Sequence, residues 1–77
     1  MNTKEIDRLM AADEALAGDG SHIFEFAARH KVSDKTVRRL LDFIQARFRA
    51  DLTADDNWYW TYSDRRFRIF TRKAAGE

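Results

Sequence analysis

The sequence predicts a mainly α fold of the α+β class, in which three helices precede a small antiparallel sheet. Two observations predict it: apolar residues recur at helical spacing as far as Phe48, and an alternating pattern follows. The chain has 77 residues, and a domain of about this size buries only about 60% of the surface of its unfolded chain. We therefore expect one domain over residues 1–73, a disordered tail at 74–77, and no deep catalytic cleft.

Composition bears on the location of the protein. The chain contains no cysteine, which excludes disulfides and thiolate metal sites and is consistent with a reducing cytosol. The amino-terminal region carries Glu5 and Asp7 and has no long apolar run, so we expect neither a signal peptide nor a transmembrane helix. These observations together indicate a cytoplasmic protein.

The first helix is predicted from its cap and its apolar spacing. Asn2 or Thr3 can cap it, and the turn Gly18-Asp19-Gly20 ends it. Asp13 falls on the apolar side of this helix, and no role is assigned to it. The apolar positions at helical spacing are Ile6, Leu9, Met10, Leu16 and Ala17.

A short second helix is predicted over residues 22–29, with Ser21 as its cap. Ile23, Phe26 and Ala27 share its inner face. Phe24 points elsewhere by helical phase, and we expect it to pack under the carboxy-terminal strands. Residues 30–32 then make a tight connection, and the small Ala27 allows two helices to cross closely.

Residues 32–49 predict a third helix with two contrasting faces, capped by Ser33. At about 100° per residue, one side gathers the apolar residues Val37, Leu40, Leu41, Ile44 and Phe48. The other side carries Lys35, Arg38, Arg39, Asp42, Ala46 and Arg49. Such a helix can pack one face against a core and expose cations on the other. We interpret residues 34–48 of it as a DNA-recognition helix.

Three strands are expected after this helix, over residues 50–53, 58–62 and 67–71, with turns at 54–57 and 63–66. Three helices followed by a two- or three-stranded β wing is the winged helix-turn-helix order. Trp58, Trp60 and Tyr62 share one face of their strand, which we interpret as core. Tyr59 lies on the opposite face and is the better candidate for an exposed contact or a dimer surface.

Positive charge is concentrated in two blocks of the chain, although the net charge is only +1. Residues 35–50 and residues 65–77 each carry five basic residues and one acidic residue, whereas residues 1–34 sum to −3 and residues 51–64 to −4. Local basic surfaces matter more for nucleic-acid binding than the whole-chain balance. The alternative is that these blocks are simply solvated faces.

The segment FEFAARHKVSDKTVRRLLDFI, residues 24–44, resembles the helix-turn-helix of DeoR-like regulators, above all the amino-terminal domain of WYL-domain transcription regulators. The motif residues are Val32, Ser33, Thr36, Val37 and Arg39, and the resemblance covers roughly residues 22–62. It implies a homodimeric transcriptional regulator, such as a repressor, that binds double-stranded DNA sequence-specifically. Lys31 replaces a frequent glycine, Leu40 replaces a common acidic residue, and no WYL domain follows, so ligand sensing is not implied. We expect a small free-standing regulator or the DNA-binding part of a longer one.

The expected DNA contacts lie at two points. In the third helix we predict Lys35, Arg38 and Arg39 in the major groove, with Ser33 and Thr36 supporting them through phosphate. At the tip of the β wing we predict Arg65 and Arg66, extended by Arg68, on the backbone or in the minor groove. The alternatives are an ion pair between Arg38 and Asp42 and, for the wing arginines, protection of an edge strand.

A rival function is protein interaction on the same fold, with the acidic stretch 51–64 as its best support and a partner of phage or regulatory origin. Enzymatic function has little support, because no nucleophile, phosphate loop or ligand cluster stands out. His22 and His30 lack the spacing of a metal site. We therefore predict no catalytic residue, no metal and no cofactor.

Overall fold

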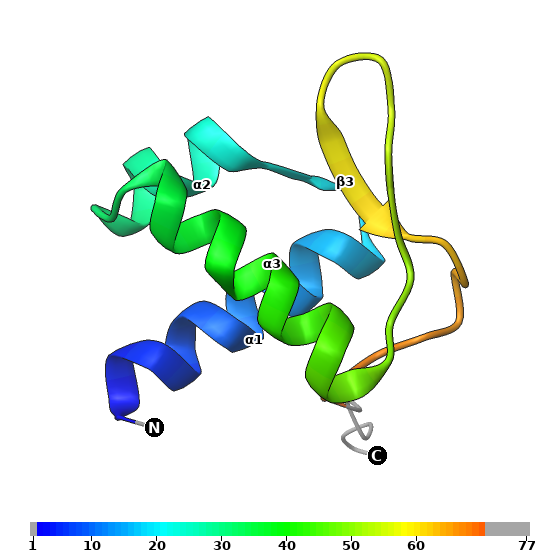
Figure 1. The fold of residues 1–77 in the computed structure, drawn as a ribbon, viewed down its shortest axis with the longest axis horizontal. Helices are drawn as coiled ribbons and strands as arrows, with labels where there is room; N and C mark the ends of the chain where they lie inside the picture. The colour runs from blue at the N-terminus through cyan, green and yellow to red at the C-terminus, as the bar shows by residue number, and fades with distance from the viewer. Residues whose placement is uncertain (1, 71–77) are drawn as a thin grey trace.

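The computed structural model describes residues 2–70 and is mainly helical with a small sheet, as predicted (Figure 1). The helices are α1 (Thr3–Ala17), α2 (Ile23–His30) and α3 (Asp34–Phe48), and the strands are β1 (Ser21–His22), β2 (Leu52–Ala54) and β3 (Tyr59–Tyr62). The predicted tail at 74–77, and the strand end at Thr71, lie outside the described residues. No helix in the described range is long and apolar enough to cross a membrane.

A capping box starts α1. The Asn2 side chain accepts a hydrogen bond from the Glu5 N–H at 2.9 Å, and the Glu5 carboxylate accepts one from the Asn2 N–H at 3.1 Å. The predicted turn follows α1, and Gly20 adopts a φ of 112° there. A Cβ at Gly20 would lie 3.1 Å from the Cβ of Tyr59, so only glycine allows the chain to pass this close to β3.

The turn between α2 and α3 is tight. Lys31 adopts the left-handed conformation, with φ 56° and ψ 46°, which glycine adopts more easily. Ser33 caps α3 by accepting a hydrogen bond from the Thr36 N–H at 3.1 Å, as predicted. The prediction that Ser21 caps α2 is wrong, because Ser21 belongs to β1 and His22 occupies the cap position without a side-chain hydrogen bond.

The sheet has the order β1-β3-β2, with both pairs antiparallel. The β2–β3 hairpin matches the prediction, and its register pairs Leu52 with Tyr62 and Ala54 with Trp60. β1, a two-residue strand between α1 and α2, pairs with the other side of β3. The strand predicted at 67–71 is wrong over its described part, 67–70, which forms no strand.

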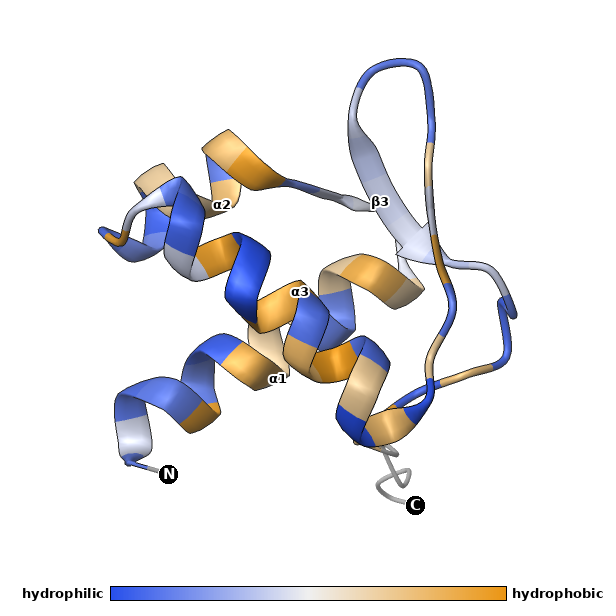
Figure 2. Ribbon diagram, in the orientation of Figure 1, coloured by the Kyte–Doolittle hydropathy of each residue, from blue (hydrophilic) through white to orange (hydrophobic). Residues whose placement is uncertain are grey.

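The core lies between the three helices and β3. Its buried apolar residues are Leu9, Ala12, Leu16, Ile23, Phe26, Ala27, Val37, Leu41, Ile44, Ala50 and Tyr62. Figure 2 shows apolar and polar residues recurring along α3, and a hydrophilic tip on the hairpin. Two aromatic predictions are wrong: Phe24 is 60% exposed on the outer side of α2, and Trp58 is 68% exposed. Trp58 leaves the pleat before β3 begins, with a φ of 66°.

Candidate nucleic-acid interface

The exposed surface of α3 divides into three stripes. Lys35 and Arg39 point away from the buried face by helical phase, and both are exposed. Arg38 and Gln45 lie on the side of the sheet, where they line a groove with Trp60. Thr36 lies on the side of α1 and lines another groove with Arg39, Arg8 and Phe43. Lys35, Arg38 and Arg39 are therefore exposed on adjacent stripes of α3, whereas Thr36 is partly buried on the flank opposite to Arg38.

Ser33 and Thr36 form the amino-terminal end of this surface. Their hydroxyl oxygens lie 3.1 Å apart, within hydrogen-bond distance. The first N–H groups of a helix, at its amino-terminal end, lack intrahelical partners and carry a partial positive charge. This charge favours a negatively charged group such as phosphate. The Ser33 hydroxyl thus caps the helix, the Thr36 hydroxyl is hydrogen-bonded to it, and both lie beside a helix end that suits an anion.

Arg38 pairs with an acid one turn before it. Its Nε lies 3.6 Å from a carboxylate oxygen of Asp34, with both side chains about half exposed. The expected pair with Asp42 is therefore replaced by this one, although Asp42 lines the same groove. An exposed pair of this kind contributes about 0.3–0.5 kcal/mol, so it does not prevent Arg38 from contacting another anion.

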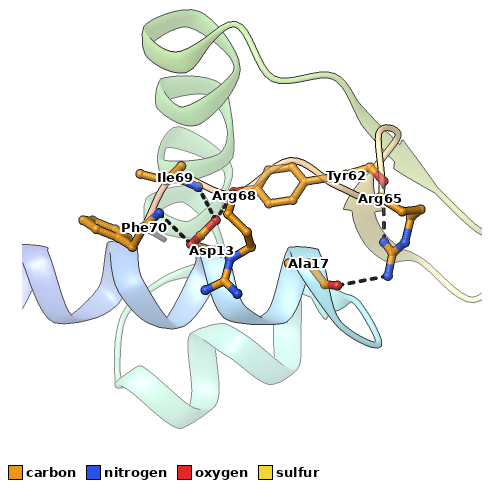
Figure 3. Close-up of polar contacts among 7 residues, drawn as sticks. All are labelled: Asp13, Ala17, Tyr62, Arg65, Arg68, Ile69 and Phe70. Carbon is orange, nitrogen blue, oxygen red and sulfur yellow. Dashed lines mark hydrogen bonds and ion pairs between the residues drawn. The ribbon is translucent and has the colours of Figure 1, made fainter. Parts of the chain in front are cut away.

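The placement of Arg65 at a wing tip is wrong. Arg65 follows β3, and its guanidinium donates hydrogen bonds to the carbonyl oxygens of Leu16, Ala17 and Gly18 at 3.3, 3.1 and 2.6 Å. Figure 3 shows Arg65 beside Ala17, at the end of α1. The last carbonyls of a helix lack intrahelical partners and carry partial negative charge. Arg65, an exposed residue, therefore caps the carboxy-terminal end of α1.

Arg68 is also engaged internally, by the buried carboxylate of Asp13. Arg68 Nε donates to Asp13 at 2.9 Å, and so do the Tyr62 hydroxyl at 2.7 Å and the backbone N–H groups of Ile69 and Phe70 at 2.9 and 3.1 Å (Figure 3). These two N–H groups are therefore unavailable to a strand partner, which explains why no strand forms at 67–70.

Protonation equilibria around Asp13 favour its charged form. Burial raises the pKa of Asp13, but the four hydrogen bonds outweigh burial and leave this pKa below its ordinary value. Burial, and then the hydrogen bond to the Asp13 carboxylate, raise the pKa of Tyr62, so its hydroxyl stays neutral and donates. Sequence reasoning missed this cluster. The available signal was a carboxylate on the apolar side of an amphipathic helix, because a buried charge requires partners.

The tip of the β2–β3 hairpin, residues 55–58, is acidic, whereas we predicted a basic wing tip. Its sequence is Asp55-Asp56-Asn57-Trp58, and the Asp55 carboxylate accepts hydrogen bonds from the N–H groups of Asn57 and Tyr59 at 2.8 and 3.0 Å. Arg66 lies elsewhere, in the turn after β3, with its side chain 93% exposed and its Nε 3.5 Å from Asp64. The predicted arginine tip is therefore wrong, since the hairpin is built from an earlier pair of strands.

Tyr59 is half-buried and contacts α2. Its hydroxyl donates to the two carboxylate oxygens of Glu25 at 3.2 and 3.3 Å, and its ring lies 5.3 Å from the ring of His22. The hydrogen bond and the negative charge of Glu25 raise the pKa of Tyr59.

Within residues 2–70, no group of three acidic or histidine side chains is arranged to hold a metal ion.

Comparisons with protein-family models, with curated proteins and with solved structures found no match.

Proposed function

We propose that this protein is a winged helix-turn-helix transcriptional regulator that binds double-stranded DNA with α3 in the major groove. One observation carries the proposal: Lys35, Arg38 and Arg39 lie together on the exposed surface of a helix whose opposite face is buried in the core. The element order supports it, because a helix-turn-helix followed by a hairpin, with β1 inserted between α1 and α2, is expected of a winged helix.

The chemistry of the α3 surface suits DNA. The major groove of B-DNA admits one helix, in which an arginine can donate two hydrogen bonds to guanine and a lysine can bond base edges or phosphates. Ser33 and Thr36 at the helix start suit a phosphate oxygen. A homodimer would present two copies of α3 to half-sites separated by about 34 Å, one turn of the duplex.

The hairpin has a different role in this proposal from the one predicted by sequence. Asp55 and Asp56 at its tip repel phosphate, so we do not assign the tip a contact with the DNA backbone. Arg65 and Arg68 are held by internal acceptors. The contacts that we assign to DNA are accordingly those of α3.

A charge reversal tests the proposal. The double variant Arg38→Glu/Arg39→Glu should lose binding to duplexes selected from a random library, measured by fluorescence anisotropy, while its circular dichroism and melting temperature stay near those of the native chain. Arg66→Glu is the matched control, because it reverses an exposed arginine outside α3. Unchanged affinity and salt dependence in the double variant would exclude α3 as the reading surface.

A second candidate, a protein-interaction module, is favoured by one observation: the acidic hairpin tip carries the highly exposed Trp58. Aromatic side chains are enriched at protein interfaces, and the acids beside Trp58 are complementary in charge to a basic partner. This candidate predicts stable oligomers or a stable complex by size exclusion with light scattering. Trp58→Ser would abolish these assemblies, whereas the Arg38→Glu/Arg39→Glu change would leave them intact.

A further inference from the structure

A group of cations continues the α3 surface onto α1. Lys4, Arg8 and Lys31 line one groove, where the amino-terminal half of α1 meets the turn between α2 and α3. Arg8 also lines the neighbouring groove together with Arg39 of α3. Lys4, Arg8 and Lys31 form one region, which we call the α1 cationic surface. Because Arg8 borders both grooves, this surface is continuous with Arg39 on α3.

The acids of this region are few and partly engaged. Glu5 lines the groove beside Arg39, but its carboxylate accepts the Asn2 N–H of the capping box. Asp7 lines the groove with Lys4 and Arg8. His30, at the end of α2, lines the same groove as Arg8, and burial, followed by the positive charges of Arg29 and Arg8, lowers the pKa of His30.

The opposite side of α3 has the reverse character. Arg38 is paired there with Asp34, and Asp42 lines the same groove. Beyond it stands the hairpin, with Asp55 and Asp56 at its tip (Figure 1). The electrostatic field across α3 is therefore asymmetric, positive toward α1 and negative toward the hairpin.

We propose that the DNA backbone is held on the α1 side, by Lys4, Arg8 and Lys31, and that the acidic hairpin tip stays off the phosphates; this inference rests on the proposed function. A helix in the major groove, which is about 12 Å wide, has a phosphate strand on each side. Cations on one side only fix the register of the protein on one strand, because phosphate contacts position a protein and base contacts specify the sequence.

The salt dependence of binding tests the inference. Each phosphate contact made by a cation contributes about 0.9 to the slope of log K against log salt concentration. With a mixed-sequence DNA duplex as probe, Lys4→Gln/Arg8→Gln should reduce the slope by about 2 and weaken binding by about tenfold or more at low salt. Arg8→Lys, which keeps the charge, should retain the native slope.

Arg66→Gln provides the matched control, because it removes one exposed positive charge in the turn after β3, away from both grooves. It should leave the slope unchanged. Lys35→Gln/Arg39→Gln tests the proposed function separately. If that variant loses binding while Lys4→Gln/Arg8→Gln keeps the native slope, the α1 surface is refuted and α3 stands. Salt-independent or absent binding by the native chain would overturn both. Thermal unfolding of each variant checks that the fold persists.

Discussion

Two basic blocks of the sequence carry equal charge, but their cations differ in exposure and in hydrogen-bond partners. Residues 35–50 and residues 65–77 each sum to +4. In the first block Lys35, Arg38 and Arg39 are exposed on α3. In the second, Arg65 is bound to the carbonyls that end α1 and Arg68 to the buried Asp13, whereas Arg66 between them is exposed. Charge density in a sequence therefore indicates a binding surface only when no internal acceptor competes for the cations.

The competing acceptors come from α1. A helix end presents unpaired carbonyl oxygens, and a buried carboxylate requires several donors. Both lie beside the chain after β3, which crosses α1 and supplies Arg65, Arg68 and two backbone N–H groups (Figure 3). Among residues 2–70, the ion pair made by an α3 cation is the exposed one between Arg38 and Asp34.

Removing the internal acceptor should have the largest effect. Asp13→Ala would leave Tyr62, Arg68 and two backbone N–H groups without their acceptor, so we expect the free energy of unfolding to fall by about 3–5 kcal/mol. Urea denaturation followed by tryptophan fluorescence measures this. Asp7→Ala, an exposed acid on the same helix, should change it by less than about 0.5 kcal/mol. Equal midpoints for the two variants would show that the cluster contributes no stability.

Acid should weaken the same cluster. Because the folded-state pKa of Asp13 is below its ordinary value of 3.8, the stability it provides is present above that value. It is lost as pH falls from about 4 through the folded-state pKa. The free energy of unfolding should therefore decline with acid, more steeply in the native chain than in Asp13→Asn. Parallel pH profiles would contradict this assignment.

Substitution of the adjacent residues Arg65 and Arg66 distinguishes the stability gained by capping α1 from any effect of an exposed positive charge. Arg65→Ala removes donors from three carbonyls at the end of α1 and should cost about 1–2 kcal/mol of stability. Arg66→Ala removes an exposed side chain and should cost less than about 0.5 kcal/mol. Neither change should alter the affinity for DNA by much. A large loss of DNA binding in Arg65→Ala, at full folding, would return this residue to the interface.

The smallest expected effect is a gain in stability. Lys31 is left-handed, and glycine relieves that conformation, so Lys31→Gly should raise the free energy of unfolding by about 0.5–1 kcal/mol. The same change removes one cation of the α1 cationic surface and should lower the salt slope by about 1. A higher free energy of unfolding together with a lower salt slope would show that Lys31 favours DNA binding but reduces stability. A loss of stability would show that the Lys31 side chain matters to the turn.

Local patterns predicted the helices well. The sequence predicted the helix at 34–48, the Ser33 cap and the glycine turn after α1. It also predicted the buried face of α2, formed by Ile23, Phe26 and Ala27. All of these follow from spacing and capping, which act within one or two turns. The strands predicted at 50–53 and 58–62 correspond to β2 and β3, with bounds that differ by one or two residues, but the wing tip was assigned to the later turn at 63–66.

Long-range partners could not be predicted in this way. β1 has two residues, too few for any periodicity, and it forms only because Gly20 lets the chain approach β3. The alternation at Phe67-Arg68-Ile69 suggested a strand, but Asp13 takes the N–H groups that a ladder would need. The assignment of Arg65 failed for the same reason, since its acceptors lie 47 to 49 residues earlier.

The Asp13 cluster also has a consequence for the order of folding. Its four donors follow it by 49 to 57 residues, so the carboxylate cannot be satisfied until almost the whole described chain has been synthesised. The helix-turn-helix, built from contacts between near neighbours, can form earlier, because closing a short loop loses less entropy. We therefore expect a nascent chain that ends before Ile69 to hold a solvated, charged Asp13 and to reach its native packing only when the last donors emerge.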